Sequence, residues 1–303
     1  MSERPVAVTS AVVVANRRRN HGGMILDNAL RRHRTSTHHA PGAPDLMPRR
    51  RILLGALAVP LLARPAAADA GAALEALLGR YVTAHADGVT RVRYAAWVAS
   101  GADHAALAAW IAAAATRRPS AMPRDEAFAY WANLYNALTL QVVLERYPVR
   151  SIRDIRSTGV PFDPKGWFGP WRTRLVTVEG RSLSLDDIEH GTMRPTFRDA
   201  RVHYAVNCAS IGCPNLRPRA WRAATLDREL DAAAAAFINH PRGVMTLPGG
   251  RLRISSIYSW FREDFGGDEA GVLAHLRRHA EPGLRNRLAA GATIAEDAYD
   301  WTL

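Results

Sequence analysis

Lysine, cysteine and long apolar runs are all scarce in this chain of 303 residues. A single lysine, Lys165, occurs among 40 basic residues, a bias that indicates arginine-rich coding more than phosphate recognition. The only two cysteines, Cys208 and Cys213, lie close together in one segment. The apolar run from Ile52 to Ala63 has 12 residues, whereas about 20 are needed to span a bilayer, so no transmembrane helix is expected in the mature chain.

The apolar run has the flanks of an export signal. A positive head, Arg49 to Arg51, precedes it, and Ala66 to Ala68 provide small residues for cleavage before Asp69. The same arginines, followed by an apolar pair, resemble the twin-arginine signal. Residues 47–68 are therefore predicted to be an export signal peptide, and the mature protein to be periplasmic or secreted. A buried helix with a basic flank is the weaker alternative.

Residues 1–46 show no apolar periodicity and are rich in Arg, Ser, Thr and His. They are predicted to be a disordered leader, or to precede a true start of the protein at Met47. Residues 69–303 contain no repeat, low-complexity linker or internal boundary, so they are predicted to form a single domain.

The basic excess is concentrated in the first 68 residues. The whole chain has a formal net charge of +12, which at first suggests a nucleic-acid partner. Residues 1–68 hold 11 arginines and three acidic residues, which leaves 29 basic and 25 acidic residues in the mature part, about +4. No nucleic-acid partner is therefore expected.

Apolar spacing predicts helices first and a mixture of helices and strands afterwards, which indicates an α+β fold. Turn residues at Glu179-Gly180 and at 248–250 predict two hairpins. A capping box of Ser184 and Asp187 predicts the start of a helix that runs to His190. Further helices are predicted over 69–86, 104–116, 125–146, 226–239, 256–266, 271–279 and 283–289, and extended segments over 91–97, 172–178, 181–185, 202–208, 243–247, 251–255 and 292–295.

The segment from Arg201 to Leu216 gathers the chemically active side chains, because it holds both cysteines, His203 and Asn207. Alternating apolar residues before Cys208 predict a short strand, and a glycine and a proline predict a loop after it. Nucleophilic and titratable groups at the end of a strand are a common arrangement in functional sites. On a continuous strand His203 and Cys208 would point to opposite faces, so they meet only if the chain turns between them.

The predicted helix 125–146 is apolar on more than one face and should be largely buried. Asn133 and Asn136 share one face of it. Buried amides need hydrogen-bond partners. We therefore expect both side chains to hold the backbone of a neighbouring loop and so to support the site, in preference to a direct catalytic role.

Four segments of the mature chain are specific in combination: Tyr130–Thr139, Ser184–His190, Val202–Ser210 with Cys213-Pro214, and Ile257–Phe265. Together they resemble the domain-of-unknown-function 547 family, which is similar to the papain/transglutaminase-like clan. The resemblance implies an α+β, papain/transglutaminase-like fold, with helices packed on an antiparallel sheet and a Cys–His site between them. It also marks Tyr258 and Asp264 as candidates for substrate binding or for support of the site.

One feature departs from the clan, which places its nucleophilic cysteine at the start of the central helix and its histidine on a following strand. His203 matches the histidine by order and by its predicted strand, but helix 125–146 contains no cysteine, and Asn133 is the nearest polar residue. Either the activity is lost, or Cys208 provides the thiol from another direction.

The first functional hypothesis is a thiol-dependent acyl-transfer enzyme of the cell envelope, similar to an amide or peptide hydrolase. Cys208 would be the nucleophile, and His203 or His190 the base. Glu189 or Asn207 would orient the imidazole. A peptide or protein of the envelope would be the acyl donor, by analogy with the clan, and no cofactor is expected.

The second hypothesis is a non-catalytic binding or structural module of the envelope, in which Cys208 and Cys213 form a disulfide. The closed loop would be small and its entropic gain modest, and a bridged thiol could not attack a substrate. A metal site of His190, His203 and both cysteines ranks last, because no close-spaced pair such as Cys-x-x-Cys is present.

Overall fold

The computed structural model describes residues 66–156 and 169–303. The predicted leader and the export signal as far as residue 65 lie outside the described residues. The first helix begins at Ala66, so the predicted cleavage position before Asp69 falls inside it. Within the described ranges, no helix combines the length and the apolar character needed to cross a membrane.

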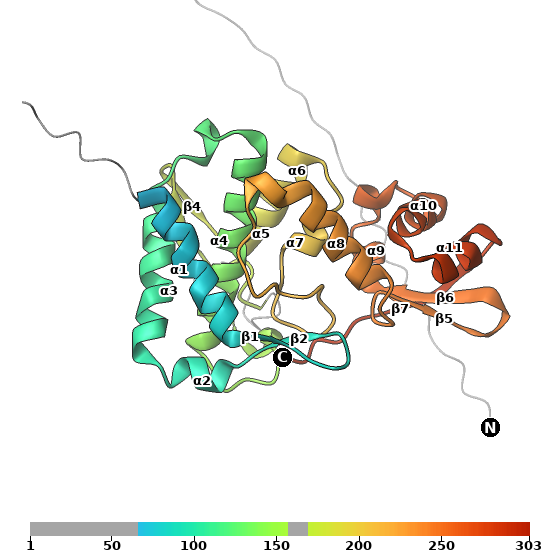
Figure 1. Ribbon diagram of the computed structural model, residues 1–303, viewed down its shortest axis with the longest axis horizontal. Coiled ribbons are helices and arrows are strands. Elements are labelled where there is room, and N and C mark those ends of the chain that lie inside the picture. The colour runs from blue at the N-terminus through green and yellow to red at the C-terminus, as the bar shows by residue number, and fades with distance from the viewer. Residues whose placement is uncertain (1–65, 157–168) are drawn as a thin grey trace, which may run out of the picture. The chain divides into compact units, whose positions relative to one another are not determined.

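The first part of the described chain is a group of helices around one buried helix, α4 (Arg124–Leu144). Sixteen of its 21 residues are buried, so nearly the whole circumference of α4 contacts other parts of the protein. Figure 1 shows α1 and α3 beside it, in blue and green. The elements of this part are α1 (Ala66–Tyr81), β1 (Val82–Ala84), β2 (Thr90–Val92), α2 (Tyr94–Val98), α3 (Gly101–Ala115) and α4.

The second part alternates short helices and short strands, and a π-helical turn, Glu189–Met193, interrupts it. Short 3₁₀ turns occur in both parts. One precedes α4, at Pro119–Ala121, and the others follow it, at Ile152–Asp154, Ala223–Thr225, Pro248–Gly250 and Arg262–Phe265. The remaining elements are β3 (Val176–Val178), β4 (Arg181–Leu183), α5 (Leu185–Ile188), α6 (Arg194–Phe197), α7 (Val202–Ala205), α8 (Leu226–Ile238), β5 (Val244–Thr246), β6 (Arg251–Ser255), α9 (Ser256–Trp260), α10 (Glu269–His279), α11 (Pro282–Ala289) and β7 (Thr293–Ala298).

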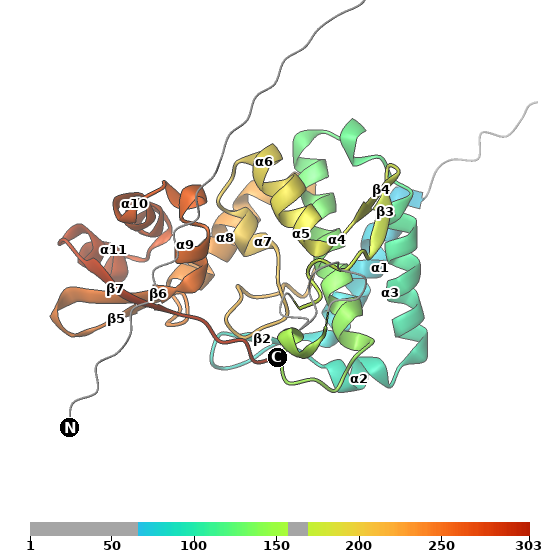
Figure 2. The same cartoon turned by 180° about the vertical axis from the view of Figure 1, so that it is seen from behind.

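The strands of the described residues form three small sheets. β1 pairs with β2, and β3 with β4, as antiparallel hairpins. The third sheet has the order β5-β6-β7, in which β5 and β6 are antiparallel but β6 and β7 are parallel. Figure 2 shows the β3–β4 hairpin beside α4 and the three-stranded sheet next to α9, α10 and α11. The predicted α+β class is confirmed, although the largest sheet is mixed rather than antiparallel.

Two hydrophobic clusters form the core, and α7 contributes to both. The larger cluster surrounds α4 and includes Val202 and Ala205, whereas the smaller one surrounds β5, β6, α10 and α11 and includes Tyr204. All four residues of α7 are buried. The short helix therefore places His203 in the interior, between the two clusters.

Two predictions of extended structure need correction. The strand predicted over 202–208 is wrong, since α7 is a single helical turn and no strand is assigned to the residues that follow it up to Cys208. Alternating apolar residues indicated one buried face, but α7 is buried on every side, so periodicity could not identify it. In the predicted segment 91–97, β2 ends at Val92 and α2 starts at Tyr94. The longer described helices and the two predicted hairpins lie close to where the sequence predicted them. The predicted helix 69–86 is too long, because β1 follows α1 directly, and α6 was not predicted.

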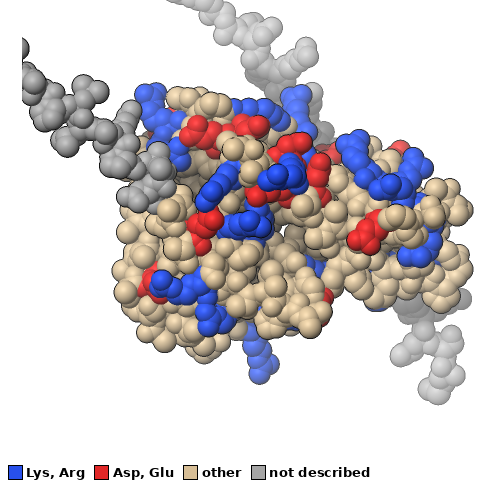
Figure 3. All heavy atoms as spheres, viewed as in Figure 1, with Lys and Arg blue, Asp and Glu red and all other residues tan. Residues whose placement is uncertain are grey.

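Charged side chains are mixed in sign on the face shown in Figure 3. Basic and acidic residues of the described part are interspersed there, and many of them meet in groups of both signs. On this face they form no extended surface of one sign.

The last residues of the chain run from β7 back over the loop that carries the cysteines. The backbone amides of Ile211 and Gly212 donate hydrogen bonds to the carbonyl oxygens of Thr302 and Asp300, each at 2.8 Å. The two backbones approach so closely that a Cβ at Gly212 would lie 2.8 Å from the backbone nitrogen and oxygen of Asp300. A glycine is therefore required at this position.

We expect Gly212→Ala to displace the C-terminal segment 299–303 and to lower the free energy of unfolding by about 1–3 kcal/mol. Amide hydrogen exchange at positions 211 and 212, together with thermal unfolding, measures the effect. Gly101→Ala is the matched control, because a Cβ at Gly101 would meet open space. Unchanged protection at 211 and 212 in the Gly212 variant would contradict this account of the docking.

Candidate functional site

A cavity of about 190 Å³ brings together half of the residues that the sequence analysis selected. Glu189 and His190 reach it from the π-helical turn, His203 from α7, and Cys208 and Cys213 from the following loop. π-helical turns are rare and often occur at functional sites, because the extra residue changes the direction of the side chains. The cavity is also lined by Tyr135, Trp171, Asp186, Val206, Pro214, Ile257, Trp260, Phe261, Tyr299 and Trp301.

His203 is held by carboxylates at both ring nitrogens. Its Nε2 lies 2.7 Å from Oδ2 of Asp264, and its Nδ1 lies 3.5 Å from Oε1 of Glu189. Arg194 donates from Nε to the same Asp264 oxygen at 2.5 Å. Asp264 therefore connects the buried imidazole to an arginine, and α7 to the segment that follows α9.

These contacts favour the charged form of all three groups. Burial lowers the pKa of His203, but the hydrogen bonds to Asp264 and Glu189 outweigh it, and the pKa lies above its usual 6.5. Burial likewise opposes ionisation of Asp264, yet His203 and Arg194 lower its pKa to about 2. The pKa of Glu189 is also lowered, because its bond with His203 overcomes the effect of burial. The directions of all three pKa shifts favour an imidazolium between two carboxylates.

Phe261 separates charged groups at the edge of the cavity. Its ring stacks on the His203 imidazole, with centroids 4.4 Å apart and an interplanar angle of 15°. The Arg194 guanidinium lies 4.9 Å from the same ring centroid. His190 packs against Phe261 at 5.4 Å, and its ring nitrogens are 4.0 Å from Asp186 and Glu189, beyond hydrogen-bonding distance.

The two cysteines are free thiols whose sulfur atoms lie 2.7 Å apart. The Cys213 sulfur also receives the backbone amide of Cys208 at 3.1 Å. The Tyr299 hydroxyl lies 3.0 Å from the Cys213 sulfur and 3.1 Å from the Cys208 sulfur. Ser210 completes the group, with its hydroxyl 2.8 Å from that of Tyr299. Several donors therefore converge on Cys213.

The pKa values of the two thiols are shifted in opposite directions. Burial disfavours the Cys213 thiolate, but hydrogen bonds from Cys208, Tyr299 and Ser210 lower its pKa to about 7. The bond to Cys213 raises the pKa of Cys208 well above its usual range, and burial adds to this. The two groups titrate together, and the directions of the two pKa shifts favour loss of the first proton from Cys213 rather than from Cys208.

Asn207 shapes the loop and does not line the cavity. Its side chain donates to the carbonyl of Pro214 at 2.7 Å and accepts from the amide of Ala209 at 2.8 Å. Ala209 has a φ of 56°, a left-handed conformation that is unfavourable for a residue with a Cβ. Asn207 therefore fixes the turn that brings Cys208 and Cys213 together.

Two asparagines of α4 hold the backbone on either side of this loop. Asn136 donates to the carbonyl of Ala205 at 2.9 Å and accepts from the amide of Asn207 at 2.8 Å. Asn133 bonds the carbonyl and the amide of Trp221 in the same way, at 2.9 and 2.8 Å. The predicted backbone-holding role of both residues is confirmed.

Tyr258 lies behind the site. Its side chain is fully buried in the smaller core cluster, and its hydroxyl is 3.3 Å from that of Tyr204 on α7. The Tyr204 hydroxyl also meets Nε2 of His275 at 2.8 Å. Burial lowers the pKa of His275 to about 4, so its ring is neutral at pH 7. Tyr258 therefore contacts the side chain next to His203 in sequence and does not reach the cavity.

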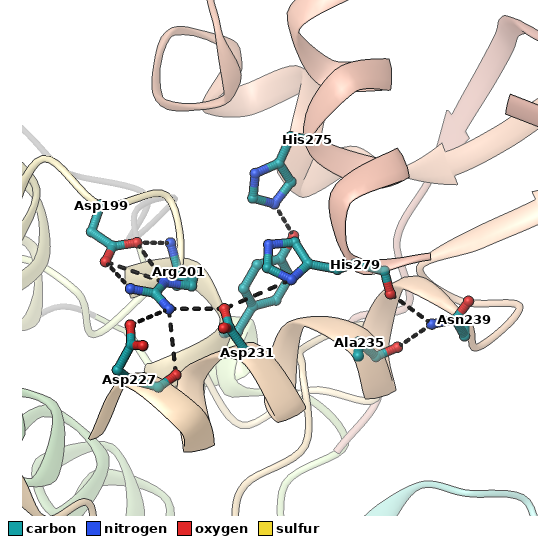
Figure 4. A network of polar contacts seen from close by, with 9 residues as sticks. Asp199, Arg201, Asp227, Asp231, Ala235, Asn239, His275 and His279 are labelled. Atoms are coloured by element: carbon teal, nitrogen blue, oxygen red, sulfur yellow. Dashed lines mark hydrogen bonds and ion pairs between the residues drawn. The ribbon is translucent and has the colours of Figure 1, made fainter. Parts of the chain in front are cut away.

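A second polar network attaches the start of α7 to α8 and α10 (Figure 4). Arg201, two residues before His203, forms ion pairs at 2.8 Å with Asp199, Asp227 and Asp231. His279 of α10 lies 3.8 Å from Asp231. These contacts keep α7 between its neighbours and so help to position His203.

Sequence reasoning missed several residues of the site, namely Tyr299, Arg194 and the tryptophans of the cavity wall. Tyr299 and Trp301 are almost 90 residues from Cys213 along the chain, and no spacing rule connects them. The aromatic content near Trp260 and at the C-terminus was the only available signal. Across residues 66–156 and 169–303, no group of three or more His, Cys, Asp or Glu side chains is arranged to hold a metal ion.

The fold and the site define an α+β domain with a pair of thiols in an aromatic-lined cavity. The family model described as "Protein of unknown function, DUF547" matches residues 119–238, so this segment of the chain belongs to that family. The matched segment contains α4, Glu189, His203 and both cysteines, whereas Asp264 and Tyr299 lie beyond it. No curated protein and no solved structure matches the chain.

Asn136→Ala should lower the free energy of unfolding by about 2–3 kcal/mol, because it leaves a buried amide without its acceptor and weakens the bonding of a buried carbonyl. Urea unfolding measures the change. Asn286→Ala on exposed α11 is the control and should change stability by about 0.5 kcal/mol or less. An equally small effect at Asn136 would refute its role in holding the loop.

Asp264→Asn should cost about 3 kcal/mol at pH 5, because it removes the charged partner of a buried imidazolium. The pKa of Asp264 is depressed to about 2, so its stabilisation is present above the unfolded value near 4 and is lost as the pH falls towards 2. The difference in stability between the variant and the wild type should therefore shrink between pH 5 and pH 2.5. Asp125→Asn, at an exposed position of α4, serves as the control. A difference that does not depend on pH would contradict the ion-pair explanation.

Proposed function

We propose that this protein is a thiol-dependent acyl-transfer enzyme that cleaves amide bonds of peptides or proteins in the cell envelope. The observation that carries the proposal is the convergence of donors on the Cys213 sulfur in the cavity wall. A thiol whose pKa is about 7 is substantially a thiolate at neutral pH without a separate base.

The pair of thiols supports a balanced reaction. The Cys213 thiolate attacks the carbonyl carbon of the amide, and the carbon–nitrogen bond breaks. The leaving amine takes the proton of Cys208, whose thiol remains protonated near neutral pH. Water then attacks the thioester and gives one proton to the Cys208 thiolate, and the acid is released as the Cys213 thiolate returns.

His203 positions the site in this proposal and does not act as the base, because both of its ring nitrogens are engaged by carboxylates. His190 lines the cavity and is about one-third exposed, so it is the imidazole there that water can reach. Cys208, which the sequence favoured as the nucleophile, becomes the proton carrier beside the Cys213 thiolate.

Two further parts of the proposal rest on the sequence. The positive head, apolar run and small-residue site of residues 47–68 support export. Buried α4, followed along the chain by His203 and a three-stranded sheet, supports a relationship with the papain/transglutaminase-like clan. In that relationship the thiol would come from the loop after α7 instead of from the central helix.

A second candidate function is a non-catalytic envelope module with a Cys208–Cys213 disulfide. The proximity of the two sulfurs favours it, because an oxidising compartment could bridge them without moving the loop far. The binding surface would then be the aromatic wall of the same cavity.

Alkylation of the reduced protein with iodoacetamide tests the activated thiol. Labelling of Cys213 should increase with pH around a midpoint near 7, because only the thiolate reacts. Cys208→Ser should keep one rapidly labelled site. Cys213→Ser should leave a thiol that is labelled only at a higher pH than Cys213, because burial still raises the pKa of Cys208 after the bond to Cys213 is lost. Hydrolysis of N-acyl amide donors should fall at least about a hundredfold in Cys213→Ser.

Midpoints near 9 for both cysteines, or hydrolysis that persists in Cys213→Ser, would refute the nucleophile assignment. Intact mass of the exported protein without reductant separates the second candidate, since a bridged pair takes no label until it is reduced. The same spectrum shows whether the mature chain begins at Asp69.

A further inference from the structure

We infer that the cavity beside the thiols is a specificity pocket for one uncharged apolar group, either a single aromatic ring or a branched aliphatic chain, on the acyl donor. This inference rests on the proposed function, since it names the kind of substrate that the same site accepts. Four observations support it: the aromatic wall, the exposure of Trp260, the compensation of charge, and the size of the cavity.

Four aromatic residues form a continuous cluster in the wall. The Trp260 ring stacks on Trp301 with centroids 5.6 Å apart and an angle of 26°, and it lies 4.9 Å from the Tyr299 ring. Trp171 meets Trp301 edge-on at 5.7 Å. Such a cluster offers ring faces and edges to an apolar group, and aromatic contacts of this kind add to the gain from burial.

Trp260 is held by this cluster and is still 48% exposed. Among the described residues, the only other large apolar side chain that is exposed is Val98, on α2. A single exposed apolar residue needs no explanation by itself. Trp260 differs because it lines a cavity that contains two thiols, so a ligand that covers it would bury apolar surface next to the reacting atoms.

Each carboxylate that lines the cavity has a basic partner. Asp186 accepts from Arg172 at 3.3 Å, and Glu189 faces the His203 imidazolium at 3.5 Å. A charged substrate group would lose its hydration on entering and would find these opposite charges already engaged. An uncharged group avoids this cost, so the pairing favours neutral substrates.

The volume of the cavity also limits the apolar group that it can accept. A cavity of about 150 Å³ in an apolar core accommodates benzene, so about 190 Å³ is enough for one aromatic ring or a branched chain of similar bulk. Two fused rings together with the backbone of an amino acid exceed it. The pocket therefore distinguishes groups by volume as well as by charge.

Tyr299 joins this pocket to the thiols. Its ring packs against Trp260 and Trp301, at 4.9 and 4.6 Å, while its hydroxyl lies about 3 Å from both sulfurs. A side chain resting on Trp260 would place the adjoining carbonyl within the reach of a single residue from Cys213. The apolar pocket thus selects the residue whose carbonyl is attacked.

Calorimetric titration with N-acetyl amino-acid amides tests the pocket. The probes are the amides of phenylalanine, glycine, lysine, glutamate and 2-naphthylalanine, each added to the reduced wild type and to Cys213→Ser, in which turnover does not occur. The phenylalanine amide should bind at least about tenfold more tightly than each of the others. Trp260→Ala should weaken that binding about tenfold, whereas Val98→Ala, the matched exposed position, should leave it unchanged.

Equal binding of all five amides, tighter binding of a charged one, or no effect of Trp260→Ala would overturn the inference. Selective binding of the phenylalanine amide without release of ammonia by the wild type would support the specificity pocket but refute the acyl-transfer proposal. If the glycine and lysine amides are hydrolysed as efficiently as the phenylalanine amide, the acyl-transfer proposal is supported and the specificity pocket is refuted.

Discussion

The two asparagines of α4 are the contacts on which the site depends most. Asn133 and Asn136 each use one amide group to bond both a carbonyl and an amide of a distant backbone, as a neighbouring strand would do. The indole of Trp221 donates to the carbonyl of Ala205 at 3.1 Å, so the two sets of contacts are connected. A buried helix thereby fixes the backbone from the end of α7 to the start of α8 without any strand pairing, and polar groups that would be costly to bury are satisfied.

The chemistry of the cavity follows from this fixed backbone. Because α7 is held between two hydrophobic clusters, His203 is buried and can stay charged only through Asp264 and Glu189. The loop after α7 then turns at Asn207, and the turn sets the two sulfurs side by side. Both arrangements follow the same principle. Burial makes an isolated charge costly, and a well-placed hydrogen-bonding partner offsets that cost. Carboxylates balance the charge of the imidazole, whereas the groups that lie around the Cys213 sulfur are neutral.

Local patterns along the chain predicted much of the fold. Helix α8 has a clear apolar periodicity, and α4 is long enough to be recognised although it is apolar on more than one face. Both predicted hairpins have glycine-containing turns, so these elements were located correctly. The capping box of Ser184 and Asp187 was also confirmed. The failure at α7 has a physical cause: a four-residue helix has too few turns to show a period, and burial on all sides removes the contrast between faces. The π-helical turn at Glu189 left no local signal either.

The sequence by itself determined the α+β class, the family, the importance of the segment that holds both cysteines, and the backbone-holding role of the buried asparagines. Each of these depends on residue type and on spacing within a short stretch. Only the tertiary structure decided that Cys213 is the thiol whose charge is stabilised, that Asp264 and Glu189 hold His203, and that Tyr299 reaches both sulfurs. The reason is that these contacts join groups from separate elements; Tyr299 and Cys213, for example, are separated by 86 positions in the sequence. Hydrogen bonding and burial act through space, so they leave no mark on the local sequence.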